Sequence, residues 1–199
     1  TGSTANFFID ELARIKDRIE GAVASSQATA DRLKAIGIQV FDLNGVGELP
    51  VYVDGCDEIN HYLHMIKGGG GALTREKIVA TSSRQFICIA DESKLVKRLG
   101  AFPLPVEVIP FGAGQVIKKF EARGYKPVLR LDADGKEVRT DENNFVVDLH
   151  LERIDHPQEL AEDLINTVGV VEHGLFLNMV DKVIVGDPNG PRVMTNANK

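Results

Sequence analysis

The sequence has few cysteines, no long apolar run and no excess of positive charge. No apolar run approaches the roughly 20 residues that a membrane-spanning helix needs, so we expect no membrane partner. Its 23 Lys and Arg against 29 Asp and Glu give a formal net charge of −6. That charge argues against nucleic acid as a partner, because such binding needs a basic face. A small anionic ligand stays open, since a local pocket can be positive on an acidic protein. The two cysteines, Cys56 and Cys88, could form one bridge but no disulfide framework, and a reduced, cytoplasmic setting is the simpler expectation.

The chain also begins without an initiator Met or a signal peptide. Its first residues, Thr1-Gly2-Ser3-Thr4-Ala5, form a small-residue loop that runs straight into a predicted helix. Such a loop normally follows a strand, and the first strand of a doubly wound sheet is commonly central. We therefore expect the biological polypeptide to extend upstream of Thr1, with a short β-branched, Gly-containing strand directly before it. Residues 22–24 would then border a gap or another chain.

The first half of the chain alternates helices with strands. Hydrophobic residues make up 43% and charged residues 26% of the 199 residues, which is typical of a globular protein with a sizeable core. There is no internal repeat and no low-complexity tract. The expected helices are 6–21, 27–36 and 72–82, and the expected strands are 22–24, 38–41, 50–53 and 85–90. This alternation predicts a parallel, doubly wound sheet.

The pattern changes after Pro103 to the order β-α-β-β-α-β, which is the split βαβ or ferredoxin-like unit. Its expected strands are 106–109, 127–131, 145–151 and 170–176, with helices at 114–123 and 157–167. Two short strands at 183–185 and 192–194 should then return to the first sheet. We therefore predict an α/β fold in which a doubly wound Rossmann-like sheet domain (1–103 and 177–199) carries an inserted, smaller ferredoxin-like α+β domain (104–176).

Three carboxylates, those of Asp54, Asp57 and Glu58, crowd the C-terminal end of the strand expected at 50–53. Ligands of open α/β sheets bind at that edge, and close like charges suit acid–base work. An acidic turn facing solvent is equally compatible with these residues. So is a Mg²⁺ site, because Mg²⁺ usually needs only one or two carboxylates and water.

Lys67 is followed by four glycines, Gly68, Gly69, Gly70 and Gly71. A nest of backbone N–H groups can hold an oxyanion, with Lys67 supplying positive charge. The alternative is a flexible linker, which is weaker because helix-forming sequence follows at once. The tract is not a Walker loop, since no Gly-Lys-Ser/Thr follows the glycines, and it does not match the dinucleotide spacing.

Glu76, within Arg75-Glu76-Lys77, falls in the first turn or so of the helix after the glycines. A helix N-terminus favours a carboxylate, which would keep Glu76 close to whatever the glycine loop holds. The alternative is a surface i,i+4 charge pair.

Two further segments could meet a phosphate. The hydroxyls and free N–H groups of Thr1, Gly2, Ser3 and Thr4 at a helix start make an anion site, although Ser3 or Thr4 could instead be a plain N-cap. Lys94 follows a predicted buried strand and could also meet a phosphate. Its segment could equally be a solvated helix start, with Asp91 or Ser93 as the cap.

These segments occur in a fixed order: Thr-Gly-Ser-Thr-Ala, Asp-Gly-x-Asp-Glu, Lys followed by four Gly, Arg-Glu-Lys and Asp-Glu-Ser-Lys. In this order the sequence closely resembles the ribose-5-phosphate isomerase A family. The resemblance runs over nearly the whole chain, including Pro103-Leu104-Pro105-Val106-Glu107-Val108, and residues 54–58 and 67–73 are its most specific parts. Cys56 is a departure, since the family more often has Ala there, and a small residue fits either way.

The resemblance implies an enzyme, an aldose–ketose isomerase of the non-oxidative pentose phosphate pathway. It would interconvert ribose 5-phosphate and ribulose 5-phosphate by enediolate proton transfer. Glu76 would be the base, Lys67 and the glycine N–H groups would hold the oxyanion, and Asp54 and Asp57 would handle hydroxyl protons and ring opening. The loop of residues 1–4 and Lys94 would bind the phosphate. A homodimer or homotetramer is implied, with no redox cofactor and no essential metal. The five histidines show no metal-ligand spacing.

Two other functions compete with the isomerase. The same fold family includes sugar-phosphate sensor domains of transcription regulators, which bind the ligand without chemistry. Such proteins normally carry a DNA-binding helix-turn-helix, which this sequence lacks, and the intact Glu76 and Lys67 favour the enzyme. A CoA-transferase-like enzyme is a weaker third option, because its covalent chemistry would need a nucleophilic Glu in a different setting.

Overall fold

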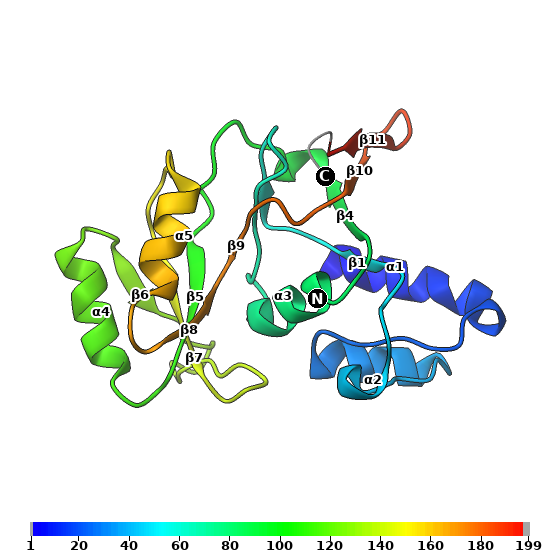
Figure 1. Ribbon diagram of the computed structural model, residues 1–199, viewed down its shortest axis with the longest axis horizontal. Coiled ribbons are helices and arrows are strands. Elements are labelled where there is room, and N and C mark those ends of the chain that lie inside the picture. Colours follow the sequence, from blue (N-terminus) through cyan, green and yellow to red (C-terminus); the bar gives the residue numbers. More distant parts are fainter. Residues whose placement is uncertain (1, 197–199) are drawn as a thin grey trace. The chain divides into compact units, whose positions relative to one another are not determined.

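The computed structural model describes residues 2–196, which fall into two compact units (Figure 1). The first unit comprises Thr1–Gly55, Arg75–Glu92 and Met179–Lys199, and the second comprises Cys56–Thr74 and Ser93–Asn178. The chain therefore passes from one unit to the other four times. The predicted domain boundaries after residue 103 and before residue 177 stay a prediction.

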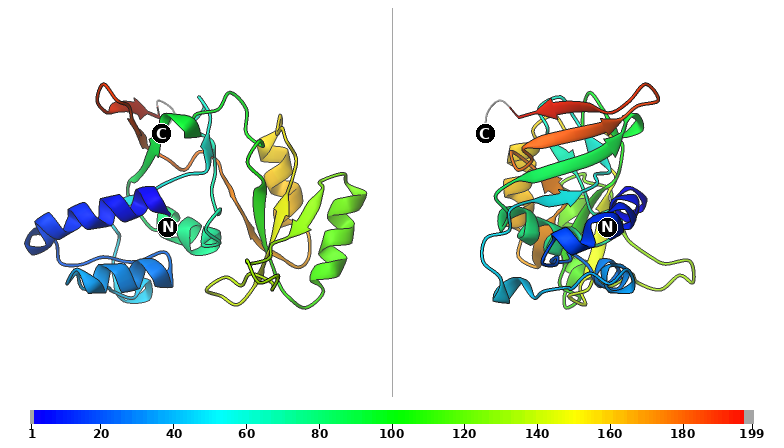
Figure 2. Two further views of the ribbon diagram at one scale, coloured as in Figure 1. Left: turned by 180° about the vertical axis from the view of Figure 1, so that it is seen from behind. Right: turned by 90° about the vertical axis from the view of Figure 1, so that its right-hand side faces the viewer.

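The first unit is built on a four-stranded sheet in the order β1-β4-β10-β11. Its strands are β1 (Tyr52–Asp54), β4 (Phe86–Asp91), β10 (Lys182–Gly186) and β11 (Arg192–Thr195). The first three are parallel, and β11 pairs antiparallel with β10, so the last two strands join the first sheet as predicted (Figure 2). Alternate residues of β4 are buried, as one face of a strand should be.

Helices α1 (Ser3–Leu12) and α2 (Gln27–Ala35) also belong to the first unit, together with the 3₁₀ turns η1 (Ala13–Arg18) and η2 (Leu43–Gly45). Ile9, Leu33 and Ile38 form a small core between them. Helix α2 is closed by Gly37, whose φ is +80°. The N–H groups of Gly37 and Ile38 bond back to Lys34 and Leu33, which is the Schellman ending of a helix.

Two strands predicted in this unit do not form. Residues 22–24 and 38–41 meet only at an isolated parallel bridge between Ala22 and Val40. Among residues 2–196, neither segment pairs with any other strand. Two segments this short, each paired only with the other, gain too little stability from pairing to form a regular ladder of hydrogen bonds. The long helix expected at 6–21 is shorter than predicted. It is α-helical only to Leu12 and continues as the 3₁₀ turn η1.

The second unit contains two antiparallel sheets with a shared core. Its larger sheet has the order β6-β7-β5-β8 and its smaller one the order β2-β3-β9. The elements are β2 (Glu58–Ile59), β3 (Met65–Ile66), β5 (Leu104–Val108), α4 (Ala113–Ala122), β6 (Pro127–Leu129), β7 (Phe145–Leu149), α5 (Pro157–Ile165), β8 (Val170–His173) and β9 (Leu175–Phe176). Apolar side chains of α4 and α5 pack on β5 and β7, and Ile66 and Leu175 of the smaller sheet join the same cluster.

The β-α-β-β-α-β order predicted after Pro103 is confirmed, including Pro157 in the first turn of α5. One strand was predicted over 170–176, but the segment divides into β8 and β9, which belong to different sheets. The break falls at Gly174, whose N–H donates to the Pro105 carbonyl. A Cβ at Gly174 would lie only 2.2 Å from the Lys67 carbonyl oxygen, so the chain crosses here too closely for any side chain.

Helix α3 (Leu73–Thr81) and the 3₁₀ turn η3 (Glu92–Lys94) each begin in one unit and end in the other. The helix predicted over 72–82 is confirmed as α3, and the strand predicted over 85–90 is confirmed as β4.

Candidate functional site

The start of α1 carries the first predicted anion-binding segment. Gly2 occupies the N-cap position with a φ of 117°, and no side chain caps the helix. The alternative in which Ser3 or Thr4 is the N-cap is therefore wrong, because both lie inside the first turn. Thr4 is near the loop after β1, since a Cβ added at Gly55 would lie 3.9 Å from the Thr4 Cβ. Thr1 lies outside the described residues.

Asp54 is the last residue of β1, and its side chain is buried, with 1% of the residue exposed. It accepts a hydrogen bond of 2.5 Å from the Tyr52 hydroxyl and one of 2.8 Å from the Gly55 N–H. Burial raises the pKa of Tyr52 well above its ordinary value, and the charges of Asp54 and Glu76 raise it further. Tyr52 therefore stays a neutral donor to Asp54 across the working range of pH.

Glu76 lies in the first turn of α3 and is only 2% exposed. The alternative of an exposed surface charge pair is therefore wrong. Its charge helps to raise the pKa of Tyr52, as does that of Asp54, so both carboxylates act electrostatically on the same buried tyrosine within the first unit. Two carboxylates shielded from water around a neutral hydroxyl can move protons with little competition from solvent.

In the second unit, Asp57 is half-buried and accepts a 2.8 Å hydrogen bond from the Gly69 N–H. Its neighbour Glu58 is buried and accepts hydrogen bonds from the N–H groups of Gly100 and Phe102, at 2.7 and 2.6 Å. The alternative of an acidic turn facing solvent is therefore wrong for Glu58, whose contacts are structural. Within residues 2–196, no group of three or more His, Cys, Asp or Glu is placed to hold a metal ion.

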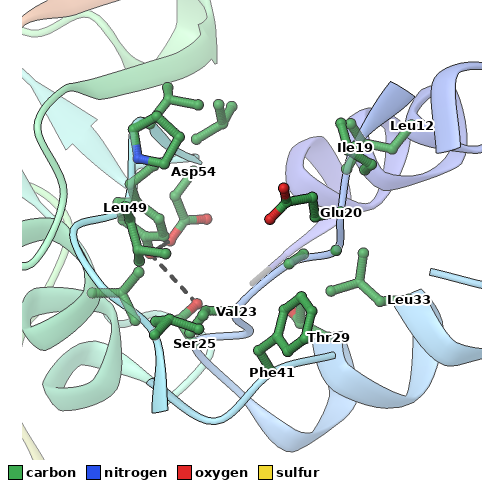
Figure 3. Close-up of a pocket in the computed structure, with 18 of the residues that line it drawn as sticks. Leu12, Ile19, Glu20, Val23, Ser25, Thr29, Leu33, Phe41, Leu49 and Asp54 are labelled. Atoms are coloured by element: carbon green, nitrogen blue, oxygen red, sulfur yellow. Dashed lines mark hydrogen bonds between the residues drawn. The ribbon is translucent and has the colours of Figure 1, made fainter. Parts of the chain in front are cut away.

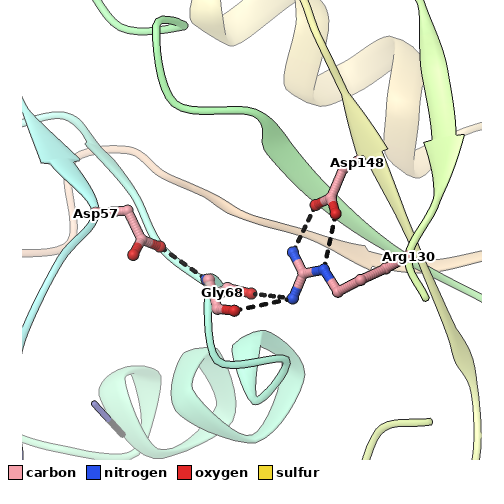
Figure 4. A network of polar contacts seen from close by, with 5 residues as sticks. Asp57, Gly68, Arg130 and Asp148 are labelled. Carbon is pink, nitrogen blue, oxygen red and sulfur yellow. Dashed lines mark hydrogen bonds and ion pairs between the residues drawn. The ribbon is translucent and has the colours of Figure 1, made fainter. Parts of the chain in front are cut away.

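Lys67 and the four glycines form an ordered loop of the second unit (Figure 4). Lys67 is 2% exposed, and its Nζ lies 5.4 Å from the centre of the Phe176 ring. Gly68 and Gly71 have φ values of +104° and +77°, which other residues rarely adopt, and the Gly71 N–H donates to the Gly68 carbonyl at 2.9 Å. These contacts show that the linker alternative is wrong.

Lys94 is the last residue of η3 and is half-buried. The next residues fix it beside β2, because Leu95 forms a bridge with Ile59 and the Val96 N–H donates to the Ile59 carbonyl. The segment is a 3₁₀ turn, Glu92–Lys94, rather than the start of an α-helix.

A cavity of about 680 Å³ lies within the first unit and reaches Asp54 (Figure 3). Residues 49–54, α1, α2 and residues 19–25 line it, mostly with apolar side chains such as Leu12 and Leu33. All three residues of β1 are among those that line this cavity. Asp54 and Glu20 are among the polar groups on its wall.

Two candidate functional residues, Tyr52 and Arg130, were not predicted from the sequence. The spacing of Tyr52 could have indicated it, because residues two apart on a strand share a face and Tyr52 is two residues before Asp54. Arg130 could not be found in this way, because it reaches the glycine loop from a point about 60 positions further along the chain. It donates to the carbonyls of Gly68 and Gly69 while its other nitrogens hold Asp148 (Figure 4).

The fold defines a mixed α/β protein, and the buried carboxylates of Asp54 and Glu76 in its first unit are groups suited to acid–base chemistry. A model of the ribose 5-phosphate isomerase A (phosphoriboisomerase A) family matches residues 21–190. The ribose-5-phosphate isomerase A of Bifidobacterium longum (strain NCC 2705) is 70% identical over 203 residues, which cover all of this chain and 87% of that protein. The chain belongs to the ribose 5-phosphate isomerase A family.

Solved structures agree with this family. The ribose 5 phosphate isomerase A of Neisseria gonorrhoeae matches with a TM-score of 0.92 at 44% identity, covering 100% of this chain and 87% of that one. A D-ribose-5-phosphate isomerase in complex with phospho-erythronic acid matches with a TM-score of 0.91 at 35% identity, covering 98% of this chain and 88% of that one. No helix among the described residues is long and apolar enough to cross a membrane.

Proposed function

We propose that this chain is a ribose-5-phosphate isomerase that interconverts ribose 5-phosphate and ribulose 5-phosphate. The relative from Bifidobacterium longum supports the reaction, and the solved relatives support it with the same fold. The observation that carries the proposal is Glu76, a carboxylate buried in the first turn of α3 whose charge acts on Tyr52 together with that of Asp54. A carboxylate in that setting is suited to carry one proton between adjacent carbons.

The reaction then runs as a proton transfer through an enediolate. Glu76 takes the proton from C2 of the open-chain aldose, and the electrons of that C–H bond form the C1–C2 double bond while the C1 carbonyl oxygen becomes negative. The same proton returns from Glu76 to C1, while the C2 hydroxyl gives up its proton and the negative C1 oxygen takes one up, so that the C2 oxygen becomes the carbonyl of the ketose and C1 carries a hydroxyl. Lys67 and backbone N–H groups of the glycine loop, residues 68–71, stabilise the negative oxygen.

The other site residues prepare the sugar for this step. Asp54 and Asp57 accept and return hydroxyl protons, including the one that opens the ring, in either order. Residues Thr1 to Thr4 and Lys94 bind the phosphate, a dianion near neutral pH. The uncapped N-terminus of α1 supports a phosphate site. No redox cofactor enters this sequence of steps.

We further propose that the sheet of the first unit is of the doubly wound Rossmann-like type and that β5 to β8 with α4 and α5 form a ferredoxin-like domain. The order β6-β7-β5-β8, with every pair antiparallel, supports the second assignment. A cytoplasmic homodimer or homotetramer is the expected form of the enzyme, and size-exclusion chromatography with light scattering tests its assembly.

The test of the proposed function is turnover by the purified chain. Ribose 5-phosphate is incubated in D₂O, and proton NMR follows the formation of ribulose 5-phosphate and the retention at C1 of the proton that came from C2. We expect ketose formation, and a far lower kcat/KM for free ribose. Tight binding of phospho-erythronic acid without turnover would identify a sensor domain instead, and equal kcat/KM for ribose and ribose 5-phosphate would contradict the phosphate site.

A further inference from the structure

Arg130 and Asp148 form a mostly buried ion pair next to the glycine loop (Figure 4). Arg130 follows β6, Asp148 lies in β7, and their side chains are only 16% and 17% exposed. The Arg130 Nε and Nη2 donate to the two Asp148 oxygens at 2.7 and 2.5 Å. This two-bond fork fixes the plane of the guanidinium group.

The remaining nitrogen of that plane points at the glycine loop. Arg130 Nη1 donates to the Gly68 carbonyl at 3.1 Å and to the Gly69 carbonyl at 3.0 Å. Two consecutive carbonyl groups therefore converge on a single nitrogen. A lysine could not reproduce this geometry, because the ammonium group is a point charge without a rigid fork.

The direction of these carbonyls decides where the loop's N–H groups point. No peptide bond within residues 2–196 is cis, and in a trans peptide the C=O and N–H point in opposite directions. The N–H groups of Gly69 and Gly70 therefore point away from Arg130. The Gly69 N–H does so toward the Asp57 carboxylate, at 2.8 Å.

The Gly70 N–H is available to a ligand. Both Gly69 and Gly70 are exposed, and among residues 2–196 the Gly70 N–H donates to no protein acceptor. A donor fixed on its carbonyl side, and open to solvent on the other, is the kind of group that stabilises a developing negative oxygen at low cost in reorganisation.

We propose that Arg130, oriented by Asp148, is a positioning residue of the isomerase reaction. It locks peptides 68–69 and 69–70 so that the Gly69 N–H holds Asp57 and the Gly70 N–H meets the enediolate oxygen. This inference rests on the proposed function. Arg130 acts only through the loop and touches neither the sugar nor the reacting carbons.

Arg130→Lys tests the inference, because it keeps the charge and removes the fork. Loss of one oxyanion donor lowers kcat roughly 10²- to 10³-fold, and a loosened donor should lower it by about tenfold to a hundredfold, with KM changed less than about threefold. The inhibition constant of phospho-erythronic acid should rise by a factor similar to the loss in kcat/KM, because its planar carboxylate carries negative charge on oxygen, as the enediolate does. Asp148→Asn should shift kcat in the same direction, and the double variant should be far from additive.

The matched control is Lys126→Met, which removes the exposed ion pair between Lys126 and Glu152 in the same unit and should leave kcat unchanged. Circular dichroism of each variant confirms folding. Folded Arg130→Lys and Asp148→Asn proteins with normal kcat and normal inhibition would overturn the proposal. So would a raised KM at constant kcat, which would mark Arg130 as a binding residue.

A second readout separates this inference from the proposed function. In NMR spectra of the protein without ligand, the Gly69 and Gly70 amide resonances should shift in Arg130→Lys and stay in place in Lys126→Met. Unchanged resonances would refute the positioning role, whether or not the chain turns over ribose 5-phosphate. Absence of turnover in the unaltered chain would refute the isomerase reaction alone.

Discussion

Replacement of Glu76 by Gln removes one charge from the first unit and almost no volume. Glu76 is buried, so its loss is not repaired by a neighbouring water acting as base. A positioned general base contributes about 10²- to 10⁴-fold, which corresponds to roughly 3 to 5.5 kcal/mol of activation free energy. We expect kcat to fall by that factor and KM to change little, because the carboxylate matters in the transition state more than in substrate binding.

The same variant carries an internal check of its geometry. The pKa of Tyr52 is raised first by burial and then by the charges of Asp54 and Glu76. Glu76→Gln removes one of these charges, so the Tyr52 pKa should fall while burial still keeps it above the ordinary value. An ultraviolet titration of tyrosinate, compared with that of a Tyr52→Phe protein, measures this shift.

Glu159→Gln is the matched control, since Glu159 also lies in the first turn of a helix but has a side chain that is 81% exposed. Turnover is followed by proton NMR with ribose 5-phosphate, and circular dichroism verifies that each protein is folded. Near-normal turnover by folded Glu76→Gln would refute its role as the base, and equal losses in both variants would show a general effect of acidic charge.

Three further predictions concern metal, phosphate and alkaline pH. Exhaustive EDTA treatment should leave activity intact, because Lys67 can supply the positive charge; activity lost to EDTA and restored by Mg²⁺ or Mn²⁺ would make Asp54 and Asp57 metal ligands. Lys94→Ala should mainly raise KM, since binding a remote phosphate is largely uniform binding, and a fall in kcat alone in steady-state kinetics would contradict this. The pKa of Tyr125 is raised from 10.0 to about 12, first by burial and then by its hydrogen bond to Asp163. The unfolded chain therefore loses this proton first, so the free energy of unfolding should fall as pH rises between those two values, and chemical denaturation of Tyr125→Phe should show a smaller fall.

The sequence was most informative where local signals act within a few residues. The helix predicted over 27–36 forms as α2 because its ending at Gly37, with a positive φ and two backward hydrogen bonds, involves only neighbouring residues. The strand and helix order from β5 to β8 follows from apolar periodicity in the same way. The burial of Glu76 was not predictable from its tripeptide, because Arg-Glu-Lys alone is typical of an exposed surface charge pair. Its burial, and the effect of its charge on Tyr52 near the end of β1, depend on the folded first unit.

Long-range pairing explains the predictions that were wrong or missing. Residues 22–24 and 38–41 have strand-like composition but meet at a single bridge, because a strand also depends on its neighbours. The apolar pattern of segment 170–176 predicts one strand. The close approach of the Gly174 backbone to Lys67 divides the segment between two sheets. Arg130 has no local signal of function, because its partners Gly68 and Gly69 are brought to it only by the folded second unit.

The crossing at Gly174 also limits how this protein can evolve. Hydrogen bonds from Gly174 N–H to Pro105 and from Lys67 N–H to Gly174 tie three separate stretches of chain at one residue. Even an alanine methyl group would stand 2.2 Å from the Lys67 carbonyl oxygen and would push the Lys67 backbone aside. Random mutagenesis with selection for isomerase activity should therefore recover no substitution at position 174, although this residue carries no side chain and performs no chemistry.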